Sequence, residues 1–157
     1  LTRLNRLELV AGSLNALLEQ VLDFFEADAQ HRNVEIVRYL DGDLPIIKMD
    51  KQTLQAALQN MVKNSMEAMS DGGQLMVRTR MMRSGVAVDL IDTGQGIGSS
   101  TLIKMFEPFY TTKDSGSGLG LPMAKKVIEA HGGVINVQSE EGRGTQFTIE
   151  FPIPKRL

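Results

Sequence analysis

Two pairs of alternating segments, each joined by a tight turn, constrain the fold of this chain more than any other feature. The four segments are residues 74–81, 85–92, 134–139 and 145–152. The last of them alternates cleanly, with Phe147, Ile149 and Phe151 on one side and polar residues on the other. Strands joined by so few residues pair antiparallel, so the sequence predicts two hairpins.

Three longer stretches carry apolar residues at the three- and four-residue spacing of amphipathic helices. They cover residues 13–33, residues 51–69 and a stretch that ends at His131. Ser13 or Asn15 can cap the first helix, and Asp50 precedes the second. A further strand is expected over residues 34–40, an edge strand before residue 12, and a short helical piece near residues 99–105. Three helices and about five strands predict an α+β fold, a mixed sheet with the helices on one face.

Composition narrows the functional classes. The 157 residues are enough for one domain with a real core. A net charge of −2 argues against a general nucleic-acid binder, and the absence of cysteine excludes disulfides and thiolate metal sites. No apolar run approaches the ~20 residues that span a bilayer. Because the chain begins at Leu1 rather than at methionine, we expect a cytoplasmic fragment of a longer protein, which can itself be membrane-anchored.

Asn60 and Asn64 lie four residues apart on the second predicted helix, so they share one of its faces. Both fall at the margin of its apolar arc, where a cleft can open. Amide oxygens are neutral ligands that suit a magnesium ion already carrying nucleotide phosphates. Taken alone, the pair can equally be surface residues that make local hydrogen bonds.

The run DTGQGIG places Asp92 at the end of a strand, followed by Gly94, Gly96 and Gly98. The glycines allow a sharp turn and a close approach of backbone to a ligand. The carboxylate can accept a hydrogen bond from an exocyclic amine. A bare turn explains the same pattern, and neither a Walker loop nor a dinucleotide fingerprint is complete.

The run GSGLGL opens the third predicted helix. Its glycines, Gly116, Gly118 and Gly120, offer backbone N–H groups near a helix N-terminus, where phosphate is stabilised. Lys113 can add a charge to the same phosphates. The alternative is a flexible linker. His131, at the end of this helix, is expected to act as a cation beside the last carbonyls, with no catalytic role.

The order of these motifs resembles one family. The chain carries, in this order, an asparagine pair, D-x-G-x-G, F-x-P-F-x-x-x-K and G-x-G-L-G-L. This series is similar to that of the catalytic ATP-binding domain of two-component sensor histidine kinases, most of all the nitrogen-regulation type. That domain belongs with the chaperone, gyrase and mismatch-repair ATPases. The resemblance covers roughly residues 12–152 and implies a two-layer α/β sandwich of the Bergerat type.

The resemblance also implies roles for particular residues. Asn64 would coordinate Mg²⁺ with help from Asn60, and Asp92 would accept the adenine amino group. Lys113 would reach the phosphates of ATP, and with the two asparagines it is a candidate catalytic residue. The other implied ATP-binding residues are Gly94, Gly96, Ile97, Phe106, Gly116, Gly118, Leu119, Gly120 and Thr145. Residues 106–118 would form a lid over ATP.

The same resemblance implies partners and boundaries. Residues 1–11 would be the remnant of an upstream helical hairpin or linker with a first strand, and residues 12–157 the catalytic domain. Neither His31 nor His131 has the setting of a phosphoacceptor. The γ-phosphoryl group would therefore pass to a histidine on the separate hairpin domain, and from there to a response regulator. The isolated fragment is expected to be a monomer that binds no nucleic acid.

Two other functions compete with the kinase. One is an ATP-hydrolysing clamp, but such relatives carry a glutamate general base where this chain has Asn60, and an amide cannot accept that proton. The other is a regulatory module, similar to an anti-sigma serine kinase, in which nucleotide tunes a protein contact. One departure from the histidine kinases is Glu67, where many have a lysine.

Overall fold

A mixed five-stranded sheet forms one layer of the molecule. The structure is a computed structural model that describes residues 6–107 and 120–153. The strands are β2 (Val34–Tyr39), β4 (Gly73–Met81), β5 (Gly85–Asp92), β6 (Val134–Glu140) and β7 (Gly144–Pro152). Their order is β2-β4-β5-β7-β6; β2 and β4 are parallel and every other pair is antiparallel. The mixed sheet and both predicted hairpins are confirmed.

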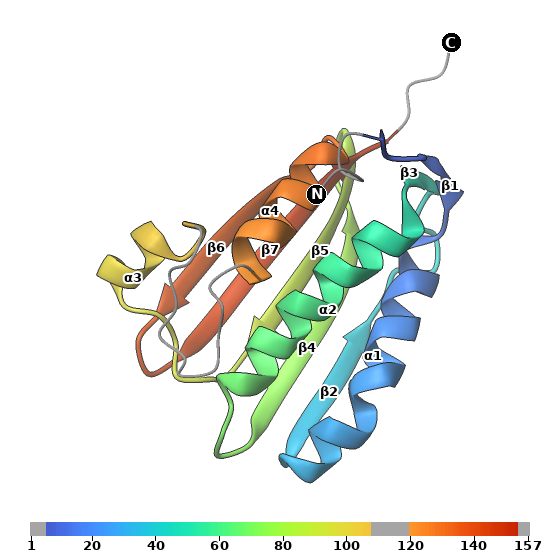
Figure 1. The fold of residues 1–157 in the computed structure, drawn as a ribbon. Helices are drawn as coiled ribbons and strands as arrows, with labels where there is room; N and C mark the ends of the chain where they lie inside the picture. The colour runs from blue at the N-terminus through green and yellow to red at the C-terminus, as the bar shows by residue number, and fades with distance from the viewer. Residues whose placement is uncertain (1–5, 108–119, 154–157) are drawn as a thin grey trace.

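The helices α1 (Leu14–His31), α2 (Lys51–Glu67) and α4 (Gly120–Ala130) lie side by side over one face of this sheet, and the short α3 (Ser99–Lys104) lies beyond it (Figure 1). Apolar residues of all three long helices and of the sheet form one core between the layers. Ser13 caps α1, since its hydroxyl accepts a hydrogen bond from the N–H of Ala16 at 3.1 Å. The predicted two-layer α+β fold is confirmed. No helix among the described residues is both long and apolar enough to span a bilayer.

A small second sheet was not predicted. The expected edge strand, β1 (Val10–Gly12), pairs antiparallel with β3 (Ile47–Met49) instead of joining the large sheet. Ile47 and Met49 are buried, but three residues are too few for alternation to be recognised in the sequence. The pairing ties residues 10–12 to residues 47–49 of the domain.

His131 links two helices rather than offering a charge at the end of one. Its Nδ1 lies 2.8 Å from the carbonyl of Val127, and its Nε2 accepts a hydrogen bond from the N–H of Asp50 at 3.0 Å. An accepting Nε2 requires its lone pair, so the proton belongs on Nδ1. Asp50 in turn caps α2, accepting from the N–H of Thr53. The end of α4 is thereby joined to the start of α2, and the expectation of a cation at His131 was wrong.

The helix-free face of the sheet carries a buried carboxylate. Asp89 is fully buried; it accepts from Nε of Arg78 at 2.9 Å, from Nε of Arg80 at 2.8 Å and from the hydroxyl of Thr148 at 2.8 Å. Burial alone would raise the pKa of Asp89, but the hydrogen bonds from Arg80, Thr148 and Arg78 outweigh it and hold that pKa at about 2.

We expect this carboxylate to make stability depend on pH. The folded-state pKa of Asp89 lies below its unfolded value of 3.8, so the stabilisation is complete above that value and is lost as the pH falls toward about 2. Asp89→Asn should lower the free energy of unfolding by about 2 kcal/mol at neutral pH. The difference between wild type and variant should shrink below about pH 4. Urea unfolding over this range measures it. The exposed Asp71→Asn is the control, and a difference that did not vary with pH would contradict the assignment.

Candidate functional site

Asp92 ends β5 on the face of the sheet that the helices cover. It is 4 % exposed, and one carboxylate oxygen, Oδ1, accepts from the N–H of Gly94 at 2.9 Å and from the N–H of Thr145 at 3.3 Å. Burial raises the pKa of Asp92, although the N–H groups of Gly94 and Thr145 and the nearby Ser65 hydroxyl oppose the shift. The backbone thus holds the carboxylate by a single oxygen. Such a group can accept a hydrogen bond from an amino group.

Ser65 is a site residue that the sequence analysis missed. Its hydroxyl is the single buried side-chain nitrogen or oxygen, within the part of the chain that the structure describes, that is left without a hydrogen bond of good geometry. It nevertheless lies close enough to Asp92 to lower the pKa of that carboxyl. An orphaned buried hydroxyl beside a carboxylate is the mark of a place where a ligand or water completes the bonding. The sequence feature that could have identified this residue is the presence of a serine inside the apolar arc of α2.

The two predicted pocket glycines, Gly94 and Gly96, pack against protein backbone. A Cβ on Gly94 would stand 2.6 Å from the carbonyl oxygen of Ala68 at the end of α2. Gly96 has φ of +74°, and a Cβ there would collide with the carbonyl oxygen of Glu140. These glycines let residues 93–98 dock between α2 and the β6–β7 hairpin, which fixes the loop that follows Asp92.

Asn60 and Asn64 both border the start of α4. A Cβ on Gly120 would lie 3.9 Å from Oδ1 of Asn60 and 4.0 Å from Nδ2 of Asn64. The Nδ2 of Asn64 also donates to the backbone carbonyl of Asn60 at 2.9 Å, which holds the amide against its own helix. Both side chains are half-buried, at the margin of the arc as predicted. The structure therefore brings Asn60, Asn64 and Gly120 together at a helix N-terminus, where anions are stabilised.

Ile97 and Phe106 are half-buried and pack against the core. The N–H of Ile97 donates to the hydroxyl of Ser139 at 2.7 Å. The ammonium of Lys125, on α4, lies 5.9 Å from the centre of the Phe106 ring. Both residues are thus anchored to the elements around the site.

The remaining predicted site residues lie outside the described part of the chain. They are Lys113, Gly116, Gly118 and Leu119, together with most of the predicted lid. No cluster of three or more acidic, histidine or cysteine side chains that could hold a metal occurs within residues 6–107 and 120–153. The amides of Asn60 and Asn64 fit a magnesium ion that brings phosphate oxygens of its own, because Mg²⁺ is usually held by few protein ligands beside substrate phosphates.

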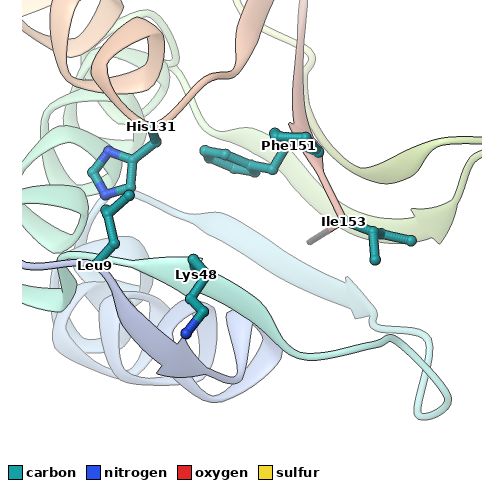
Figure 2. Close-up of a pocket in the computed structure, with 6 residues that line it drawn as sticks. Leu9, Lys48, His131, Phe151 and Ile153 are labelled. Atoms are coloured by element: carbon teal, nitrogen blue, oxygen red, sulfur yellow. The ribbon is translucent and has the colours of Figure 1, made fainter. Parts of the chain in front are cut away.

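A separate pocket of about 190 Å³ lies at the other end of α4. It is lined by Leu9, Lys48, His131, Phe151, Pro152 and Ile153 (Figure 2). The His131 ring meets the Phe151 ring edge-on, with 6.4 Å between their centres. None of the predicted nucleotide residues lines this pocket, so it forms no part of the candidate site.

Comparison with known proteins agrees with this geometry. Residues 49–155 match the family described as histidine kinase-, DNA gyrase B-, and HSP90-like ATPase. A curated relative, the sensor histidine kinase ZraS of Escherichia coli (strain K12), is 34 % identical over 98 % of this chain. The chain spans 33 % of the length of that relative.

Solved structures place the chain more narrowly. The catalytic domain of histidine kinase ThkA superposes with a TM-score of 0.84 at 32 % identity, covering 93 % of this chain and 96 % of that one. Full-length ShkA in complex with AMPPNP gives a TM-score of 0.87 at 28 % identity, over 99 % of this chain and 34 % of ShkA. ThkA in complex with the response regulator protein TrrA gives 0.81 at 28 % identity, over 94 % of this chain and 42 % of that one.

The buried carboxylate, the amide pair at the helix start and the two-layer fold occur here in a chain whose sequence matches the family over most of its length. The chain belongs to the histidine kinase-, DNA gyrase B- and HSP90-like ATPases, as a catalytic domain of the sensor histidine kinase type.

Proposed function

We propose that this domain binds Mg-ATP between α2, α4 and the loop after β5, and delivers the γ-phosphoryl group to a histidine on a separate helical domain. The observation that carries the proposal is that the site has two ends of different chemical character. At one end stands the buried Asp92 with the orphaned Ser65 hydroxyl. At the other, Asn60 and Asn64 border the start of α4.

Each end has its own task. The Asp92 carboxylate would accept a hydrogen bond from the amino group of adenine. The burial of Asp92 strengthens this hydrogen bond because water does not compete for the carboxylate. Asn64, with Asn60, would hold Mg²⁺, which supplies charge neutralisation at the phosphates when bound. The N-terminal N–H groups of α4 would stabilise phosphate oxygens. From the sequence alone, Lys113, Gly116 and Gly118 would contribute to the same end.

Transfer suits these residues better than hydrolysis. Phosphoryl transfer asks a protein mainly to position its substrates and to neutralise charge. Asn60 faces Gly120 at the phosphate end, and its amide cannot take a proton from an attacking water at neutral pH. This favours a histidine acceptor over water.

The partners follow from the same proposal. The acceptor histidine would lie on a helical hairpin upstream, with residues 1–11 as the connection and residues 12–157 as the catalytic domain. A response regulator would receive the phosphoryl group next, in line with the complex of ThkA and TrrA. The domain would work in the cytoplasm. The isolated fragment would be a monomer, because dimerisation would belong to the hairpin.

The two ends of the site should respond differently to mutation. Asp92→Ala should raise the Kd for ATP roughly 100-fold with or without Mg²⁺, since it removes a hydrogen bond to a charged group. Asn64→Ala should instead remove most of the gain in affinity that Mg²⁺ confers, and leave metal-free binding nearly unchanged. Calorimetric titration with a non-hydrolysable ATP analogue, at several Mg²⁺ concentrations, measures both. Gln52→Ala, in the first turn of α2, is the control; equal Mg²⁺ dependence in Asn64→Ala and wild type would refute the metal assignment.

Binding through Asp92 should also weaken in acid. The carboxylate must be ionised to accept the amine, and burial raises its pKa. The loss of ATP affinity on lowering the pH should therefore begin above the ordinary aspartate value of 3.8. The same titration repeated at several pH values measures the loss, and Asp92→Ala should not show it.

Phosphoryl transfer should require a second domain. With γ-labelled ATP, this chain alone should take up no label, because both ring nitrogens of His131 are engaged in the fold and His31 is the last residue of α1, outside the candidate site. Adding the upstream hairpin of the same protein should yield an acid-labile label on the hairpin. A hairpin with its acceptor histidine replaced is the control. Label on His31 or His131 would count against the proposal.

A further inference from the structure

Ser139 is a half-buried residue of β6, and its hydroxyl oxygen takes part in three hydrogen-bond contacts. Its hydroxyl accepts from the N–H of Ile97 at 2.7 Å, lies 2.9 Å from the carbonyl oxygen of Gly144, and lies 2.8 Å from the hydroxyl of Thr145. One side chain thus joins the loop after Asp92 to the β6–β7 hairpin.

The three contacts determine where the protons lie. A carbonyl oxygen only accepts, so the single proton of Ser139 goes to Gly144. The short contact with Thr145 then needs a proton from Thr145, since Ser139 has none left. All three contacts are satisfied together only in this arrangement, which leaves the Thr145 hydroxyl with lone pairs for other partners.

Thr145 stands directly opposite Asp92 in the pairing of β5 with β7, and both are buried. Its N–H also donates to the Asp92 carboxylate at 3.3 Å. An acceptor hydroxyl therefore lies next to an acceptor carboxylate. A base that presents an amino group to these two acceptors, directly or through water, can donate hydrogen bonds to them. A base that presents a carbonyl at the same place brings a third acceptor and forms no hydrogen bond there.

We propose that Ser139 is a positioning residue for base selection: it accepts the proton of Thr145 and so keeps the Thr145 hydroxyl from acting as a donor toward the base. The inference rests on the proposed nucleotide function and adds to it a preference for one base over another. Without Ser139, the Thr145 proton becomes free to turn toward the ligand and to serve a base carbonyl.

The test compares ATP with GTP on the intact chain. Ser139→Ala should weaken ATP binding and weaken GTP binding less or not at all, so that the preference for ATP falls roughly tenfold, the scale of one hydrogen bond. Ser139→Thr, which keeps the hydroxyl, should retain the preference. Gln138→Ala, on the opposite face of the same strand, is the matched control.

A double variant separates positioning from simple loss of packing. Thr145→Val removes the hydroxyl whose direction Ser139 sets, so adding Ser139→Ala to it should change the ATP-to-GTP ratio no further. Should Ser139→Ala not fold, Ser139→Cys keeps nearly the same volume and carries the comparison, because a thiol makes only weak hydrogen bonds.

The outcomes are distinct. If the wild type bound neither nucleotide, the proposed function and this inference would both fall. If the wild type preferred ATP but Ser139→Ala weakened ATP and GTP equally, or if the two substitutions were additive in the ratio, only the role of Ser139 would be overturned.

Discussion

The burial of α2 against the sheet is the constraint from which the rest of the site follows. Seven residues of this helix are buried, and Asn60 and Asn64 stand at the edge of that buried arc. Successive helical residues turn by about 100°, so a shift of one position would carry the amides into the core or away from α4. The same rotation that places the amides at Gly120 places Ser65 toward Asp92. The link between Asp50 and His131 holds α2 and α4 together at their other ends.

The two ends of the site rest on different physics. Asp92 is buried, so each hydrogen bond to it is stronger than it would be in bulk water, and in the proposed function the arrangement of donors and acceptors there would select the base. Around Asn60 and Asn64, neutral amides and a helix N-terminus suit charge that a ligand brings with it. In the proposed function, selectivity would therefore belong to the carboxylate end, and affinity for phosphate and metal to the other.

Much of the fold could be predicted because its signals are local. The alternation of β7, the cap at Ser13 and the turns between strands all lie within a few residues of what they determine. The small sheet of β1 and β3 could not be predicted, because its two short strands are far apart in the sequence. The burial of Asp89 was not predicted either, since its hydrogen-bond partners come from other strands, β4 and β7.

The sequence by itself determined most of the elements and the family, and it singled out the candidate nucleotide residues, because spacing along a helix and the order of motifs are properties of the chain. Only the tertiary structure decided that Gly94 and Gly96 make room for protein backbone and that His131 serves as an acceptor between helices. It also decided that Ser65 lies beside Asp92 and that Ser139 joins the loop after Asp92 to the β6–β7 hairpin. The physical reason is common to all of these. Each depends on a hydrogen bond or a steric contact with an element distant in the chain, and a hydroxyl or a glycine carries no mark in the sequence of the partner it will meet.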